Sequence, residues 1–215
     1  MNTTVNRLLL SLIACLVLAG CDQLRIPPSE DVSRLESIDR KFEQEDFDHV
    51  ISETTKYVQE YPRSFKGWNL LGWAYVKSGE LDKAEECFDK TLSINPRWDN
   101  AHVGKGAIYR EKGDLKNARK SYLQAIRIVP ENAEAFGSLL VIELLEENDE
   151  KAVEYGEKAW ALRKDLATIP ANLAVAYHYL GDHAKRDQYY EEAEKLGYNG
   201  LQTLKDIFEG KMTIR

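Results

Sequence analysis

The chain has 215 residues, of which 43% are apolar and 30% are charged, a composition typical of one folded globular domain. With 6 prolines, 13 glycines and no long low-complexity run, collagen-like and mucin-like classes have no support. The formal net charge is −7, and acidic and basic residues are interspersed. Nucleic-acid binding is therefore disfavoured, because it needs a concentrated positive face.

The first twenty residues differ from all that follow. Arg7 is their only charge, and Leu8 to Leu18 form an almost continuous apolar run. This run is too short to cross a hydrocarbon core of roughly 30 Å comfortably, and it ends in small residues, as a cleavable export signal does. We therefore predict a signal peptide at residues 1–20.

The end of this segment, Leu18-Ala19-Gly20-Cys21, resembles the lipobox of bacterial lipoproteins. The resemblance implies cleavage after Gly20 and a covalent lipid, including palmitate, on Cys21; no other cofactor is expected. A single acyl chain binds membranes only reversibly, at roughly 0.8 kcal/mol per buried CH₂, so two or three chains are expected to anchor the protein. The alternative is an ordinary secretory signal followed by a chance cysteine.

The residues after the lipobox predict a location and a tether. Asp22 resembles the residue that retains lipoproteins of Gram-negative bacteria in the inner membrane, so we expect the periplasmic face of that membrane, with the outer membrane as the alternative. Residues 21–30 contain Pro27-Pro28 and no helical period, and are predicted to form a lipidated tether. Cys87 is the one thiol left over, and we expect it to be buried between helices as a small hydrophobe.

A period of 34 residues runs through the rest of the chain, and five independent columns share it. A repeat of this length predicts an array of small supersecondary units that stack on one another. The columns are Pro62, Pro96 and Pro130; Gly72 and Gly106; Gly79 and Gly113, with Gly181 two periods on; Tyr75 and Tyr109, with Tyr177 two periods on; and Ala84, Ala118 and Ala152.

The segment from Phe65 to Trp98 is the best copy and resembles the tetratricopeptide repeat (TPR). The resemblance implies two antiparallel amphipathic helices per repeat, with Gly79 breaking the first helix. The chain is therefore predicted to be an all-α solenoid of about five units. They lie at residues 31–64, 65–98, 99–132, 133–166 and 167–200, followed by a C-terminal capping helix and tail at 201–215. The residues of the best copy that fit the pattern are Trp68, Leu71, Gly72, Tyr75, Gly79, Ala84, Phe88 and Pro96.

The third copy departs from the pattern inside its helices and at its turn, at Leu140, Glu143, Glu147, Gly156 and Lys164. An acidic cluster overlaps this copy, and we expect it to be an exposed helix-turn-helix corner and not a cation site. The cluster consists of Glu143, Glu146, Glu147, Asp149 and Glu150.

The resemblance also implies a binding surface, because the first helices of such repeats build a concave wall that binds extended peptides or helices. Trp73 is either an aromatic anchor on this wall or a core residue under the N-terminal repeat. The residues expected to contact a partner are Lys66, Asn69, Trp73, Lys77, Asn100, Val103, Arg110, Val141 and His178.

Some relatives capture a C-terminal carboxylate with a clamp of Lys, Asn and Arg on this wall. The corresponding columns hold Asn69, Trp73, Gly104, Glu134 and Ser138, so the clamp is absent. A partner captured through its C-terminal carboxylate is therefore not expected.

Catalytic and metal-binding spacings are missing as well: the sequence contains no HExxH, GxSxG, P-loop or paired-cysteine motif. We therefore expect a non-enzymatic adaptor that binds proteins of an envelope assembly machine, such as pilus assembly, secretion or peptidoglycan synthesis. Two alternatives stay open. One is a protein that binds a small molecule or glycan near Trp73, Tyr75 and His178, and the other is an enzyme whose site is assembled from scattered residues.

Overall fold

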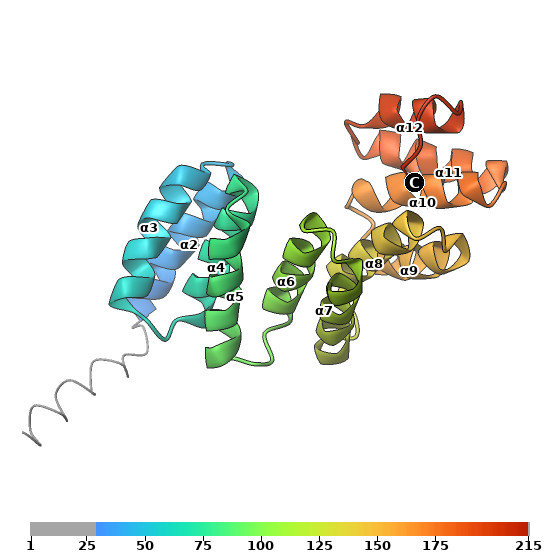
Figure 1. Cartoon of the computed structure of the whole chain (residues 1–215). Coiled ribbons are helices and arrows are strands. Elements are labelled where there is room, and N and C mark those ends of the chain that lie inside the picture. Colours follow the sequence, from blue (N-terminus) through green and yellow to red (C-terminus); the bar gives the residue numbers. More distant parts are fainter. Residues whose placement is uncertain (1–28, 215) are drawn as a thin grey trace, which may run out of the picture. The chain divides into compact units, whose positions relative to one another are not determined.

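A computed structural model of the chain describes residues 29–214, with the backbone alone for residues 29–31. The predicted signal peptide, Cys21 and Asp22 lie outside the described residues. Within residues 29–214 the structure contains eleven helices and no strand (Figure 1). None of these eleven helices is both long enough and apolar enough to cross a membrane.

The helices form five successive pairs and one final helix, which confirms the all-α helix-pair fold predicted from the 34-residue period. The first helix begins at Ser29, two residues before the expected start of the first repeat. The pairs are α2 (Ser29–Glu43) with α3 (Phe47–Glu60), α4 (Phe65–Ser78) with α5 (Leu81–Ile94), α6 (Asp99–Glu111) with α7 (Leu115–Ile128), α8 (Ala133–Leu145) with α9 (Asp149–Leu162), and α10 (Thr168–Tyr179) with α11 (His183–Lys195); the final helix is α12 (Leu201–Phe208).

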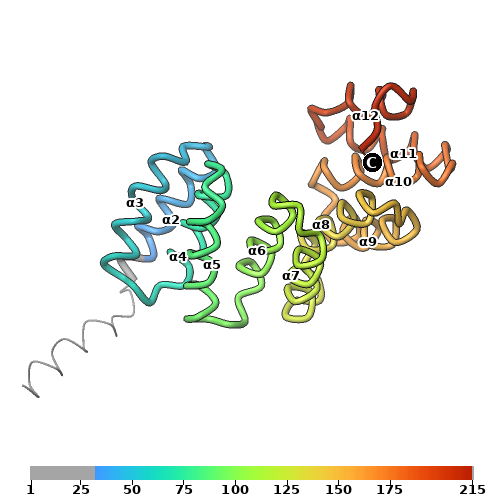
Figure 2. The backbone as a smooth tube through the Cα atoms, in the orientation of Figure 1, coloured from blue at the N-terminus to red at the C-terminus, as the bar shows by residue number. Residues whose placement is uncertain are grey.

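The chain divides into two compact units, residues 1–96 and 97–215, and each is considered by itself (Figure 2). In the first unit, α2 contacts both α3 and α4, and α4 contacts α5. In the second unit, α8 contacts α6 and α10 as well as its own partner α9, and α12 packs on α10 and α11. The first helices of successive pairs are therefore direct neighbours within each unit.

A turn with one left-handed residue joins the two helices of each pair. This residue is Gly79 (φ +80°), Gly113 (φ +77°) or Gly181 (φ +76°), which explains the glycine column of the sequence. In the two remaining pairs, α2 with α3 and α8 with α9, Glu45 (φ +60°) and Glu147 (φ +62°) adopt the same conformation. The turn is therefore kept where glycine is missing, although a residue with a Cβ is strained there by roughly 1–2 kcal/mol.

In two of the pairs, α4 with α5 and α6 with α7, a glycine of the first helix faces an aromatic ring of the second. A Cβ atom added to Gly72 would lie 2.8 Å from the ring of Phe88, and one added to Gly106 would lie 2.6 Å from the ring of Tyr122. Both rings are fully buried. The small residue on the first helix therefore makes room for the large one on the second.

The pair of α8 and α9, which is the third full copy of the repeat, reverses these sizes. Leu140 stands one period after Gly106, and Gly156 stands one period after Tyr122. A Cβ atom on Gly156 would lie 2.9 Å from Leu140 and 2.5 Å from Leu173. The departures at Leu140 and Gly156 thus compensate for each other, and the interior of this pair stays filled.

Cys87 is a buried free thiol in the interior of the first unit, as predicted. Burial raises the pKa of this thiol to about 12, with a smaller contribution from the charge of Glu86. The side chain therefore behaves as a small hydrophobe, because the thiolate form that reacts with oxidants and metals is suppressed.

Candidate protein-binding surface

The expected binding residues of the first unit share one face of α4, because they are spaced by three or four residues. Lys66 and Lys77 are exposed, and Asn69 and Trp73 are half-buried. Ser64 caps the start of this helix by accepting a hydrogen bond from the backbone N–H of Gly67, at 3.2 Å. The face therefore presents one aromatic side chain with a single lysine on each side of it.

Trp73 is held by its own helix pair. Its ring lies edge-on to Phe88 of α5, with centroids 5.6 Å apart and planes at 74°. Such a pair contributes about 0.5–1.5 kcal/mol beyond the area it buries. Trp73 is thus half-buried with Phe88 as one of its contacts, and its expected role as an aromatic anchor stays a prediction.

The expected residues of the second unit lie on three first helices. Asn100 and Arg110 of α6, Val141 of α8 and His178 of α10 are all half-buried, and Arg110 forms an ion pair with the neighbouring Glu111 at 2.9 Å. Val103 of α6 is only 4% exposed. Its side chain is packed in the interior and offers no surface to a partner, which corrects its expected place on the binding face.

The face around His178 is partly covered by the C-terminal segment of the chain. The ring centroid of His178 lies 5.1 Å from that of Phe208 in α12, and the hydroxyl of Tyr179 lies 3.3 Å from that of Thr213. Leu204 of α12 is buried in the same unit. The predicted capping helix is therefore present, and it occupies part of the face expected to bind a partner.

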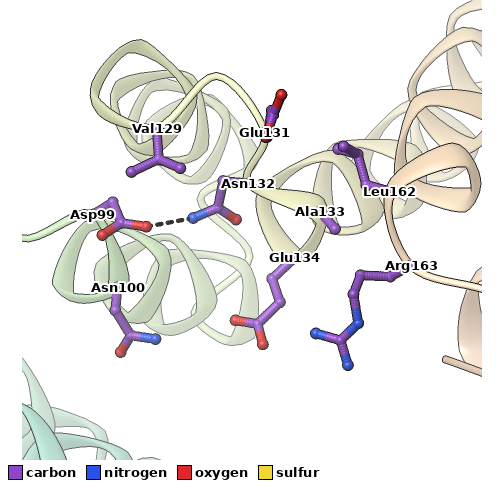
Figure 3. Close-up of a pocket in the computed structure, with 9 residues that line it drawn as sticks. All are labelled: Asp99, Asn100, Val129, Glu131, Asn132, Ala133, Glu134, Leu162 and Arg163. Carbon is purple, nitrogen blue, oxygen red and sulfur yellow. Dashed lines mark hydrogen bonds between the residues drawn. The ribbon is translucent and has the colours of Figure 1, made fainter. Parts of the chain in front are cut away.

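A polar hollow of about 410 Å³ opens in the second unit, where two helices begin and two helices end (Figure 3). The starts of α6 and α8 contribute most of its polar groups, whereas the ends of α7 and α9 contribute the apolar Val129 and Leu162 and the charged Arg163. Asn100 is the one member that was expected to bind a partner. The residues that line the hollow are Asp99, Asn100, Val129, Glu131, Asn132, Ala133, Glu134, Leu162 and Arg163.

Asn132 fixes one wall of this hollow with both ends of its side-chain amide. Its Oδ1 accepts a hydrogen bond from the backbone N–H of Ala135 at 2.8 Å, which caps α8. Its Nδ2 donates to Oδ2 of Asp99 at 2.8 Å, the dashed line in Figure 3. The starts of α6 and α8 are thereby tied together.

The charges of the hollow are unequal. Asp99, Glu131 and Glu134 contribute three carboxylates, against the single guanidinium of Arg163. Arg163 donates from Nε and Nη2 to the two carboxylate oxygens of Asp165, both at 2.7 Å. These hydrogen bonds lower the pKa of Asp165 to about 2. The one cation of the hollow is therefore already paired, and the surface of the hollow is acidic.

Glu143 is 2% exposed, so the expectation of an exposed acidic corner is wrong for this residue. Arg119 of α7 reaches across to it and donates from Nε and Nη2 to Glu143 Oε1 at 3.1 and 3.0 Å, and also binds Glu146. The buried carboxylate joins α7 to α8 and is structural.

Glu157 of α9 anchors a second polar cluster that the sequence did not reveal. Its Oε1 accepts hydrogen bonds from the hydroxyls of Tyr177 and Tyr189, each at 2.8 Å. The two tyrosine rings are stacked at an interplanar angle of 3°, and burial raises the pKa of both hydroxyls. The cluster fastens α9, α10 and α11 to one another. Across the described residues, no group of three or more His, Cys, Asp or Glu side chains is arranged to hold a metal ion.

Three segments match family profiles: residues 65–97 and 171–196 match "tetratricopeptide repeat", and residues 106–139 match "TPR repeat". The Hsp70-Hsp90 organising protein of Plasmodium falciparum is 22% identical over 187 residues, covering 86% of this chain and 67% of that protein. The chain spans between 13% and 67% of the length of the first curated relatives it matches.

Solved structures agree with the repeat assignment. The thermophilic TPR protein TTC0263 of Thermus thermophilus matches with a TM-score of 0.68 at 20% identity, over 82% of this chain and 95% of that one. PilF of Pseudomonas aeruginosa matches with a TM-score of 0.70 at 18% identity, over 83% of this chain and 84% of that one. Three segments of the chain therefore match tetratricopeptide-repeat models, and the solved structures share its fold.

Proposed function

We propose that the protein is a lipid-anchored adaptor of the bacterial cell envelope, which binds a partner protein along the first helices of its repeats. The observation that carries this proposal is the face of α4. There Trp73 is fixed by Phe88 yet remains partly at the surface, between the exposed cations Lys66 and Lys77. Tryptophan is enriched among the residues that contribute most to binding at protein interfaces.

The absence of an enzymatic role is part of the proposal. The buried carboxylate of Glu143 and the half-buried carboxylate of Glu157 are both engaged with groups of the fold, Arg119 in one case and two tyrosines in the other. A general acid or base has to reach a substrate, and these groups are occupied in holding helices together. These contacts support our proposal that the protein acts by recognition.

The proposed partner belongs to a membrane-associated assembly machine of the envelope, such as one for pili, secretion or peptidoglycan. A photoreactive residue in place of Lys77 of α4 tests this in living cells. Lys90 of α5 is the matched control, because it is also an exposed lysine in the first unit but lies on the second helix of the same pair. We expect one dominant envelope protein to be crosslinked from position 77 and not from position 90. Crosslinking from position 90 alone would contradict the proposed face.

The anchor is tested separately, through the motif Leu18-Ala19-Gly20-Cys21. Cells fed with alkyne-palmitate should label the wild-type chain, and Cys21→Ser should abolish the label and release the protein from the membrane fraction. Asp22→Ser should move the labelled protein from the inner to the outer membrane. Membrane association that survives Cys21→Ser would refute the lipid anchor and leave the binding role to be judged by crosslinking.

A further inference from the structure

We propose that the hollow between the starts of α6 and α8 and the ends of α7 and α9 binds a lysine or arginine side chain on an exposed segment of the partner protein. The inference rests on the proposed function, since it specifies the chemistry of the partner. The hollow belongs to the second unit, whereas the face of α4 that carries the proposed function belongs to the first.

Apolar side chains form part of the lining of the hollow. Val129 is 37% exposed and Leu162 is 38% exposed, and both line the hollow beside Ala133. Lysine and arginine carry long aliphatic stems that cover apolar surface while the charged head stays at a polar rim. The volume of about 410 Å³ is sufficient for such a side chain and its neighbours.

The rim selects a cation. Glu131 and Glu134 form no ion pair with any residue in the described part of the chain, and Asp99 shares one oxygen with Asn132. Figure 3 shows Glu134 between Asp99 and Asn100 on one side and Arg163 on the other. Arg163 is held by Asp165 and also interacts electrostatically with Glu134, so the three carboxylates outnumber the one positive charge that lines the hollow.

Helix dipoles do not reverse this balance. The starts of α6 and α8 each bring about half a positive elementary charge, and the ends of α7 and α9 each bring about half a negative one. All four helix ends meet at the hollow, so their contributions largely cancel. The side-chain carboxylates therefore decide the sign of the potential.

The excess of carboxylates over guanidinium groups in the lining also determines which charge the hollow rejects. An anionic chain end would be repelled by this rim, whereas a cationic side chain would be attracted. A protein segment fits better than a small molecule, because small-molecule sites usually enclose most of their ligand and this hollow is open.

The test uses the full chain in detergent micelles and three fluorescein-labelled nine-residue peptides, which are identical apart from a central Leu-Lys-Leu, Leu-Gln-Leu or Leu-Glu-Leu. Fluorescence anisotropy should show the tightest binding for the lysine peptide and none for the glutamate peptide. Raising the salt concentration from about 0.05 to about 0.5 M should lower the affinity for the lysine peptide several-fold, because exposed charges are screened.

Variants locate the binding. Glu134→Lys should lower the affinity for the lysine peptide about tenfold or more, as expected for a like charge placed at a contact. Glu150→Lys is the matched control, because Glu150 is an exposed glutamate at the second position of α9, as Glu134 is at the second position of α8. The Glu150→Lys variant should leave the affinity for the lysine peptide unchanged. Glu131→Gln, in the loop before α8, should weaken binding about threefold without touching a helix.

Equal binding of the glutamate and lysine peptides, no binding of the lysine peptide, or equal effects of Glu134→Lys and Glu150→Lys would each overturn the inference. Crosslinking from position 77 separates this failure from failure of the adaptor role. A partner that is crosslinked there and keeps its affinity in Glu134→Lys would preserve the adaptor and eliminate the hollow.

Discussion

A single methyl group at position 106 tests how tightly the helices of a pair are packed. The Cβ atom of Gly106→Ala would lie 2.6 Å from Cε1 of Tyr122 and 2.8 Å from two further ring atoms. Tyr122 is fully buried, so its ring has no free space into which to move. Overpacking of this kind costs about 1–3 kcal/mol, whereas replacing glycine by alanine in a helix gains up to about 1 kcal/mol. Since a whole ring edge is involved, we expect a net loss of about 2 kcal/mol.

Gly137→Ala provides the matched control in the same unit. Gly137 lies in α8, and the atom nearest to an added Cβ is Cγ1 of Ile169 at 3.9 Å, an ordinary contact. This variant keeps the gain in helix propensity without a clash and should be stabilised by about 0.5–1 kcal/mol. Urea unfolding followed by circular dichroism compares the two midpoints. Midpoints that shift in the same direction would refute the packing argument.

Three more predictions concern the turn, the reversed pair and the thiol. Glu147→Gly should raise the free energy of unfolding by about 1 kcal/mol, because it relieves a left-handed φ, and a lowered urea midpoint would contradict this. Leu140→Gly and Gly156→Phe should each destabilise the chain by about 2 kcal/mol or more, and the double variant should recover at least about 1 kcal/mol; strictly additive losses in the same unfolding assay would refute the compensation. Cys87 should resist maleimide at pH 8 in the native chain and react fully in urea, because burial raises its pKa from 9.0 to about 12. The same shift means that its contribution to stability is complete below pH 9.0 and is lost as the pH rises toward 12, so rapid native labelling or a stability that increases over this range would argue against it.

Local signals made most of the fold predictable. Gly79 and Gly113 mark the turns because a left-handed residue is needed there, and prolines recur after the second helices. These signals act within a few residues, so a single sequence is enough to detect them. Glu45 and Glu147 show that the turn persists where its usual residue is missing, because the neighbouring helices determine it.

Interactions between distant residues were harder to predict. Leu140 and Gly156 look like two separate departures until the structure places one against the other. Glu143 belongs to an acidic run and was expected to be exposed, but Arg119, 24 residues earlier, pairs with it in the interior. Charge and periodicity do not report such contacts.

The binding surface was predictable only in part. The face of α4 follows from helical spacing, whereas the hollow depends on how two loops bring the ends of α7 and α9 to the starts of α6 and α8. Val103 was misplaced because its column was assigned from the repeat alone, and burial depends on the packing around that particular helix.

The central claim is that a partner binds along the first helices of the repeats. Hydrogen–deuterium exchange on the full chain in detergent micelles, with and without the protein captured from position 77, measures this directly. The account predicts slower amide exchange in α4, α6 and α8 on binding, with little change in α5, α7 and α9. Protection confined to α5, α7 and α9 would contradict it.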